Sequence, residues 1–465
     1  MTWEKPGRNR FEPRMKSAVS DETKFKDEGC ILCRNKAEWN LMKYFDFGKN
    51  FYRPSFLWTE LNTSLEFKDI LGKEREHMFF HEYIHFLQDI TTVYGYANFS
   101  KIMNLIKATY HKIKERKSAG NTELHIPISF FDDEFRDINN NLFENYLKYT
   151  DDDEEYDQIT VDRVELINVN VENINVKTYK IHFNGDRETF FGAHAIFEST
   201  CHILEKKCYN LTPPKLKIPY DMAEKICVFY SEYFAEHKDY ILDLCEYSLM
   251  FFNSAEVFVM ILEAFKNDAD YFPGNSNDFY DYMFKIVQPT GKYNVETFFE
   301  KQKNELVADV RGVFKSELYA EFHEWVIETI EKGFCFKRDN KFIFSRIYKC
   351  NPTGFLCYAI PGIGMPATYN QEGQIFTANK NFNVSKCIYL SRAVSEVFDN
   401  IIFGKRKCGL KEACIFANSV TGNRINITEF CDEEPWKNFP ADENAELCGF
   451  CQVWKTLGLS NIKIV

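Results

Sequence analysis

Apolar residues recur with a helical period along most of this chain. Within 68–94 and 98–117 they fall three or four positions apart, which predicts two amphipathic helices separated near Gly95. A longer helical region extends from Pro219 to about Gly333 and is broken by proline-containing turns. The helices predicted within it are 220–236, 240–252, 255–265, 279–287 and 295–330.

One region instead alternates apolar and polar residues. The segments 159–171 and 176–183 do so on either side of Glu172-Asn173, which predicts a β-hairpin near 159–183. The acidic run Asp151 to Glu155 precedes it and is predicted to be a solvated loop, because it lacks the glycine and spaced ligands of a calcium loop. The whole pattern predicts an α+β fold that is predominantly α-helical with a small β element.

These patterns predict that the chain is organised in three consecutive parts. Residues 1–60 form an irregular N-terminal segment that packs on the core, and residues 61–340 form the main helical domain with its hairpin. Residues 341–465 form a mixed module. It opens with the strand-like stretch 342–347 and the turn-rich stretch 361–364.

Composition narrows the class of protein. A net charge of -12 argues against nucleic-acid binding. The most apolar stretch, 240–265, is interrupted by Asp243 and Glu246, so no membrane span is expected. The first 18 residues lack the apolar core of a signal peptide. The 15 cysteines are therefore expected to be reduced thiols or metal ligands in a cytoplasmic protein, whose oligomeric state the sequence leaves open.

One short motif carries chemistry. His81 and His85 are one helical turn apart, with Glu82 beside the first, and apart from Glu82 the residues from Met78 to Leu87 carry no charge. Residues i and i+4 share a helix face, so both imidazoles can reach one metal ion while Glu82 is rotated toward a metal-bound water. This spacing is typical of zinc hydrolases.

The motif resembles that of the zincin metallopeptidases over about a dozen residues. The resemblance implies a zincin-like catalytic core with one catalytic Zn²⁺ held by His81 and His85, with Glu82 as general base and then acid. It implies a metallopeptidase whose substrate is a protein or peptide. A hydrolase of other amides shares the same site.

A catalytic zinc needs a third protein ligand. The segment 191–205 follows a strand-like stretch and the Gly192 break, and it predicts a helix on which Glu198 lies four residues from both His194 and His202. The gluzincin branch of the zincins takes its third ligand from a Glu on a downstream helix. The resemblance therefore implies Glu198 as ligand, with His202 as a catalytic oxyanion donor or a neighbour of the ligand, although that branch usually has Asp in place of His202. His202, His194 and, more weakly, Glu205 are rival ligands, and Tyr220 is another candidate oxyanion donor.

Other interpretations stay open. The two histidines could be core residues or hold a structural zinc, and His77 extends their stripe as a helix-start or supporting residue. The chain could also be a binding or regulatory protein that keeps the zincin scaffold without turnover. A third alternative is an interaction module centred on the cysteine-rich C-terminal part.

Five cysteines lie in the last 60 or so residues, and Cys448 and Cys451 have zinc-knuckle spacing. We predict a structural zinc held by Cys408, Cys414, Cys448 and Cys451. Free buried thiols are the ordinary alternative. Pairing of Cys30 and Cys33 with Cys448 and Cys451 is another, and a redox Cys-x2-Cys is disfavoured because no βαβ context surrounds either pair.

Overall fold

The computed structural model describes residues 2–4, 58–61, 76–128 and 155–465, with short gaps in the last range. The gaps are 172–173, 212–214, 269, 290–293, 314, 371–374, 378–381, 383, 405–406, 412–413, 416–417, 419–424 and 441–446. The described residues are mostly helical and carry small sheets, so the predominantly helical α+β prediction is confirmed at that level.

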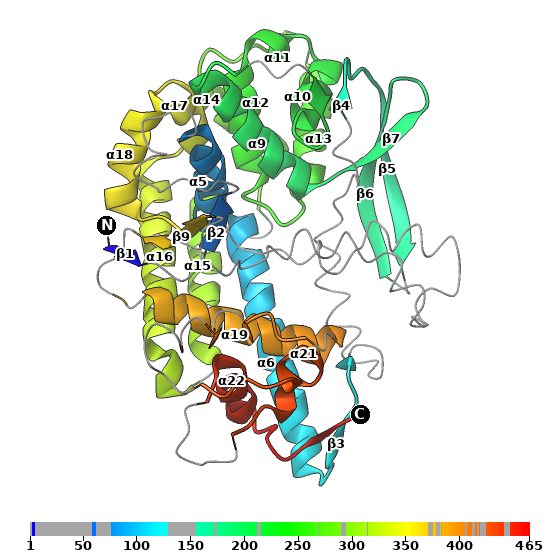
Figure 1. Ribbon diagram of the computed structural model, residues 1–465. Coiled ribbons are helices and arrows are strands. Elements are labelled where there is room, and N and C mark those ends of the chain that lie inside the picture. Colours follow the sequence, from blue (N-terminus) through cyan, green and yellow to red (C-terminus); the bar gives the residue numbers. More distant parts are fainter. Residues whose placement is uncertain are drawn as a thin grey trace.

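The helix α5 (Glu76–Thr91) runs through the middle of the protein, in contact with α6, α9 and α16 (Figure 1). The helices that follow it are α6 (Val93–Ser118), α9 (Ala193–Cys208), α10 (Met222–Tyr230), α11 (Tyr233–Glu236), α12 (Lys238–Ser248), α13 (Ser254–Asn267), α14 (Ser276–Ile286), α15 (Val295–Gly312) and α16 (Ala320–Asp339). The C-terminal ones are α17 (Ile343–Tyr348), α18 (Pro352–Ile363), α19 (Val384–Phe403), α21 (Phe430–Glu433) and α22 (Gly449–Thr456).

Close backbone packing fixes α5 in place. Gly333 of α16 lies so near α5 that a Cβ there would stand 2.2 Å from the carbonyl oxygen of Ile90. The hydroxyl of Tyr96 donates to the carbonyls of Ile90 and Ile330, which links α5, α6 and α16. The predicted break between α5 and α6 falls at Thr92, whose side chain caps α6.

The predicted hairpin is confirmed. Strands β5 (Val161–Val171) and β6 (Ile174–Phe183) pair antiparallel, and β7 (Arg187–Phe191) adds to β6. The sheet lies at one side of the molecule, against α10 and α13 (Figure 1). Because β7 leads through Gly192 directly into α9, the sheet anchors the start of that helix.

Three other sheets join distant parts of the chain. Strands β1 (Thr2–Glu4), β10 (Ile375–Thr377), β9 (Ala367–Asn370) and β2 (Trp58–Leu61) form one sheet in that order. Strand β3 (Glu123–Leu124) pairs with β11 (Lys463–Ile464), and β4 (Glu155–Tyr156) pairs with β8 (Leu216–Lys217). Apart from β1 and β2, the predicted N-terminal segment lies outside the described residues, as does the acidic run up to Glu154.

Two local predictions for the start of the C-terminal module are wrong. Residues 342–347 were expected to be a strand, but they belong mainly to α17, because the Glu246 carboxylate accepts hydrogen bonds from the amides of Ile343 and Phe344 at 3.1 Å each. Lys337 binds the same carboxylate. The expected turn at 361–364 is instead the last turn of α18, which ends where Gly364 takes a φ of 103°.

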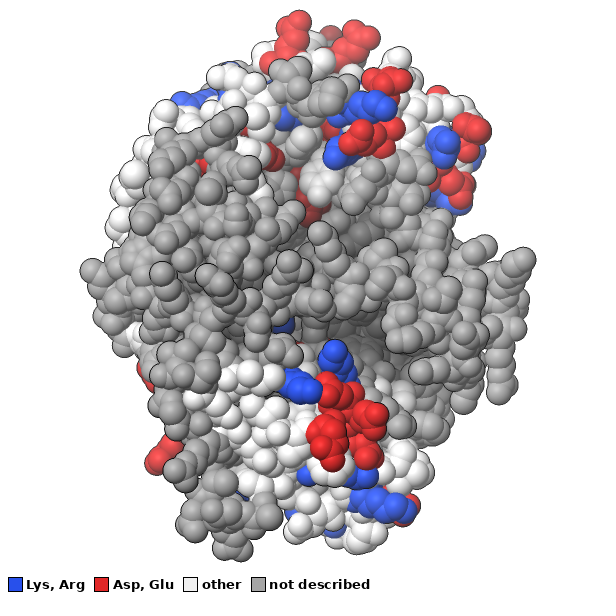
Figure 2. Space-filling view, in the orientation of Figure 1, with Lys and Arg blue, Asp and Glu red and all other residues white. Residues whose placement is uncertain are grey.

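The predicted helix 295–330 is two helices. The segment 313–319 separates α15 from α16 and contains the 3-10 turn Glu317–Tyr319. On the face shown in Figure 2, the described Lys and Arg side chains lie beside Asp and Glu side chains, so the two charge signs are mixed there. Within the described part of the chain, no helix is both long and apolar enough to cross a membrane.

Candidate metal centre

The helix α5 presents the two motif histidines on one face. Its other faces are packed with side chains that solvent does not reach, among them Phe80, Ile84 and Leu87. The side chains of His81 and His85 retain 16% and 13% exposure, respectively, and their rings are 4.9 Å apart between centroids. The predicted sharing of one helix face is therefore confirmed.

The helix α9 brings Glu198 to the same place. It packs directly against α5, and its buried residues Ile196, Phe197 and Leu204 anchor it in the core. Oε2 of Glu198 lies 3.3 Å from Nε2 of His81 and 3.5 Å from Nε2 of His85. These two histidines and Glu198 therefore converge from helices that are more than 100 residues apart in the sequence.

These two distances match the spacing of zinc ligands. Ligand atoms about 2.1 Å from a tetrahedral zinc stand about 3.4 Å from one another. Oε2 of Glu198 is buried and makes no hydrogen bond of acceptable geometry with any described residue, although it faces both imidazoles. A buried carboxylate oxygen in this position suits a cation better than a hydrogen bond.

The other ring nitrogen of each imidazole, Nδ1, has a hydrogen-bond partner, which fixes the tautomer. Nε2 of Gln88 donates to the carbonyl of Phe197 at 3.1 Å, so Oε1 of Gln88 must be the atom that accepts from Nδ1 of His85, at 2.9 Å. Nδ1 of His81 lies 3.1 Å from a carboxylate oxygen of Glu205. Because both Nδ1 atoms act as donors, both Nε2 lone pairs are left for a metal.

Glu205, a rival candidate for the third ligand, contacts the Nδ1 side of His81 and not the Nε2 side that faces Glu198. One of its oxygens contacts His81, and the other lies 2.6 Å from Nδ1 of His77. His77 therefore lies behind His81, in the supporting position predicted as one of its two roles. The carboxylate of Glu205 orients two imidazoles of α5 from one turn of α9.

The ionisable side chains of this centre shift one another's pKa values. Burial alone would lower the pKa of His81, but the nearby carboxylates of Glu198 and Glu205 outweigh burial and raise that pKa to about 10. Burial likewise opposes a rise in the pKa of His85, yet Cys201 and Glu198 outweigh it and the pKa is raised. The pKa of Glu198 is held well below its usual range despite burial, by the nearby imidazoles of His85 and His81. An ionised carboxylate here attracts any cation that replaces the two imidazole protons.

Cys201 was not foreseen, although its position three residues after Glu198 puts it on the same face of α9. Its sulfur lies 3.4 Å from Nδ1 of His85, and ligand atoms of His81, His85 and Cys201 all lie within 4.8 Å of one another. Burial raises the pKa of Cys201 to about 12, which keeps the thiol protonated. This sulfur faces the Nδ1 side of His85, whereas Glu198 faces the Nε2 atoms of both histidines.

The remaining histidines border the centre. Nδ1 of His194 is 3.8 Å from Oε1 of Glu198, and Nε2 of His202 is 3.7 Å from a carboxylate oxygen of Asp221. Burial lowers the pKa of His202, so this side chain is neutral near pH 7. The ring of Tyr220 lies 6.2 Å from that of His81 and 5.6 Å from that of His202. The ring of Tyr220 thus lies beside those of both His81 and His202.

Glu82 lies on α5 between the two histidines. Its side chain is half-buried, and its charge acts on both His81 and Cys201 by raising their pKa values. Glu82 directly follows His81 in the sequence, so it is near the proposed ligands, as a general base would have to be.

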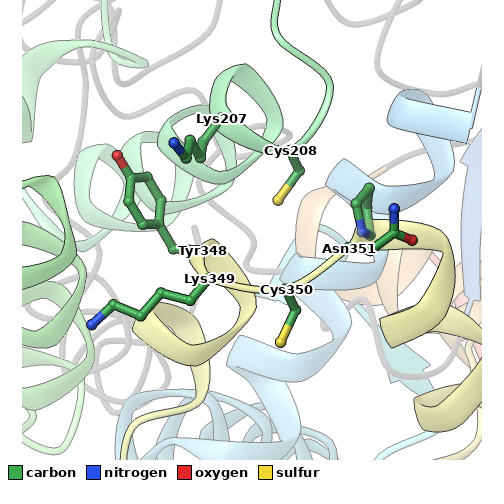
Figure 3. Close-up of a pocket in the computed structure, with 7 residues that line it drawn as sticks. Lys207, Cys208, Tyr348, Lys349, Cys350 and Asn351 are labelled. Atoms are coloured by element: carbon green, nitrogen blue, oxygen red, sulfur yellow. The ribbon is translucent and has the colours of Figure 1, made fainter.

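A cavity of about 490 Å³ lies at the far end of α9, lined among others by Lys207, Cys208, Tyr348 and Cys350 (Figure 3). Neither motif histidine nor Glu198 lines it. It is therefore separate from the candidate metal centre.

The predicted cysteine ligands Cys408, Cys414, Cys448 and Cys451 are all buried with free thiols, and Cys431 is buried near them. Cys30 and Cys33 lie outside the described residues. Comparison with family models, with curated proteins and with solved structures gives no significant match to this chain.

Proposed function

We propose that this protein is a zinc-dependent hydrolase, and specifically a metallopeptidase, with His81, His85 and Glu198 as the zinc ligands. The observation that carries the proposal is the approach of Oε2 of Glu198 to Nε2 of both histidines, at 3.3 and 3.5 Å. Two neutral imidazoles and one carboxylate are a ligand set that catalytic zinc sites use, and they leave a fourth position for water or substrate.

A zinc ion in such a site lowers the pKa of its water and polarises a substrate carbonyl. Glu82 is the residue that takes the proton from the attacking water and then passes it to the leaving amine. Gln88 and Glu205 keep the imidazoles in the tautomers that expose Nε2. His202, Tyr220 and His194 are the candidate donors to the negative oxygen that forms on the substrate.

The proposed substrate is a protein or peptide in the cytoplasm. The free thiols of all described cysteines favour a reducing compartment. The acidic net charge of -12 favours basic or neutral substrates, because an acidic protein repels acidic ones at long range.

The proposal is tested with Glu82→Gln in the full chain, assayed on a peptide library and for zinc content. We expect the variant to keep its zinc and to lose at least about 100-fold in hydrolysis, since a general base contributes that much. Glu300→Gln, an exposed change on α15, is the matched control and should change neither.

Two results would refute the proposal. Full hydrolysis by Glu82→Gln would remove the proposed base. A wild-type protein that holds zinc but cleaves no peptide or simple amide would favour the alternative, a binding or regulatory protein on the same scaffold.

A further inference from the structure

The cavity at the far end of α9 contains two thiols that take no part in the proposed hydrolysis. Cys208 is the last residue of α9, and Cys350 lies in the connection between α17 and α18. Figure 3 shows Cys208 on the α9 side of the cavity and Cys350 on the side of that connection. Cys208 is half-buried, Cys350 is exposed, and both thiols are free. Small reagents in solution can therefore reach this pair.

One shared carbonyl holds the two cysteines near each other. The carbonyl oxygen of Ile347 accepts from the sulfur of Cys208 at 3.8 Å and from the amide of Cys350 at 2.9 Å. The sulfur of Cys208 thus lies within about 7 Å of the Cys350 amide nitrogen, whereas the Cα atoms of bridged cysteines stand about 4.4–6.8 Å apart. A disulfide can span this distance once the Cys350 side chain turns toward Cys208.

A second shared acceptor holds the same two segments together. Oε1 of Glu76 accepts from the hydroxyls of Tyr209 and Thr353, at 2.8 Å each. Tyr209 directly follows Cys208, and Thr353 comes three residues after Cys350. Glu76 is buried at the start of α5, so the end of α9 and the start of α18 meet at its carboxylate. Two independent contacts therefore keep the thiols close without a covalent bond.

Positive charge flanks both cysteines. Lys207 directly precedes Cys208, and Lys349 directly precedes Cys350. Nζ of Lys349 lies 2.8 Å from a carboxylate oxygen of Asp239, whereas Lys207 has no carboxylate partner among the residues that the structure describes. A nearby cation stabilises the thiolate, which is the form that reacts with oxidants.

The two thiols differ in their access to an oxidant. Burial raises the pKa of Cys208 to about 11, so this thiol stays protonated near pH 7. Cys350 is the exposed member of the pair. An oxidant that enters the cavity therefore reacts first with Cys350.

We propose that Cys208 and Cys350 form a reversible disulfide when the protein encounters a peroxide, which makes this cavity a redox modification site. Peroxide converts the Cys350 thiol to a sulfenic acid and is itself reduced to water. The Cys208 thiol then attacks that sulfur, so the S–S bond forms as the S–O bond breaks and a second water leaves. A small thiol reductant restores both thiols by exchange and is oxidised to its own disulfide.

The disulfide joins the last residue of α9 to the connection before α18. It closes a covalent loop that contains every helix from α10 to α17, so it restricts mainly the unfolded chain. The oxidised protein should therefore melt at a higher temperature than the reduced protein. The proposal does not depend on the proposed hydrolysis, because neither cysteine contacts His81, His85 or Glu198 in the structure.

The test uses the full chain, reduced and then treated with a few equivalents of hydrogen peroxide before its remaining thiols are alkylated. Mass spectrometry of the unreduced digest should find a peptide in which Cys208 and Cys350 are cross-linked, and a thiol reductant should remove it. Cys357→Ser changes an exposed cysteine of α18 that does not line the cavity. This control should form the same cross-link.

Single variants separate the roles of the two thiols. Cys208→Ser lacks the thiol that attacks the sulfenic acid, so Cys350 should stay oxidised long enough to react with dimedone. Cys350→Ser should leave the Cys208 thiol unoxidised. Dimedone labelling of Cys208 in place of Cys350 would overturn the proposed order of reaction.

A measurement on the wild-type protein covers variants that fail to fold. In glutathione buffers of increasing oxidation, the cross-linked fraction should follow a two-electron transition, and the melting temperature should rise with that fraction. A pair that stays reduced in peroxide would overturn the proposal. So would overoxidation of Cys350 without a cross-link, pairing of Cys350 with another cysteine, or a disulfide between two chains.

Discussion

Gln88 fixes the orientation of His85. Its Oε1 accepts the Nδ1 proton of that imidazole at 2.9 Å, while its Nε2 is held by the carbonyl of Phe197. Gln88 is completely buried and lies one turn after His85 on α5. The helix therefore carries both the proposed ligand and the residue that determines which ligand nitrogen faces the metal.

Replacement of Gln88 should weaken metal binding without removing any ligand. We expect Gln88→Leu to lower zinc affinity by about 10- to 100-fold, which is the usual effect of losing a partner of a ligating histidine. Competition with a chelator measures the affinity. Thr109→Val, which removes a buried hydroxyl from α6, is the control, and an affinity within twofold of wild type in Gln88→Leu would contradict the role.

Loss of Glu198 should abolish the stabilisation by zinc at this site. At a zinc concentration of about 100 times Kd, a bound ligand adds about 2.7 kcal/mol to the free energy of unfolding. We expect Glu198→Ala to lack this gain, as measured by melting temperature with and without zinc. Cys201→Ser should keep most of it, and the reverse ranking of the two variants would make Cys201 the ligand.

Asp243 should make stability depend on pH. Burial raises its pKa from 3.8 to about 7, and the nearby Ser276 and Ser345 only moderate that rise, since neither carboxylate oxygen has a hydrogen bond of good geometry. The folded state thus holds a proton that the unfolded state releases. Stability from this group is complete below about pH 4 and is lost as the pH rises to about 7.

The expected result of Asp243→Asn follows from this loss of stability as the pH rises. The variant should lack this loss, and at pH 8 it should be more stable than wild type by up to about 4 kcal/mol, at 1.36 kcal/mol per pKa unit. Urea unfolding at pH 5 and pH 8 provides the measurement. The exposed Asp281→Asn on α14 should behave as wild type at both values, and equal pH dependence in both variants would contradict the prediction.

Glu246 should contribute strongly to folding. Its carboxylate accepts the amides of Ile343 and Phe344 at the start of α17 and binds Lys337, whose side chain is 11% exposed. Glu246→Ala leaves that lysine without its partner, so we expect a loss of about 3 to 5 kcal/mol in the free energy of unfolding. Chemical denaturation tests this, with the exposed Glu300→Ala as control, and a loss below about 1 kcal/mol would be inconsistent with it.

The sequence predicts those parts of the structure that depend only on the spacing of nearby residues. The i, i+4 relation of His81 and His85 and the alternation in 159–183 need only helix and strand periods, and both are confirmed. The approach of Glu198 to the histidines was implied only by a resemblance. Its third-ligand role remains a proposal, although the geometry is the one expected.

Other features depend on residues far away in the sequence. Residues 342–347 look like a strand because they are apolar, but the carboxylate of Glu246, almost 100 positions earlier, caps them as a helix. Cys201 belongs to no motif, and its contact with His85 emerges only when α5 and α9 are packed together. Gln88 lies on α5 itself, three residues after His85, but the orientation of its amide depends on the carbonyl of Phe197 in α9. The sheet that contains β1 and β2 likewise depends on strands that are far apart in the sequence.

That sheet has a practical consequence for handling the protein. Strand β10 is covered on one side by β1, and β9 is covered on one side by β2. Removing the first 61 residues, by proteolysis or by expressing a shortened chain, would leave β9 and β10 as a two-stranded ribbon with an unpaired edge on each strand. Unpaired margins of this kind recruit strands from other molecules, so trimmed protein should self-associate before it unfolds.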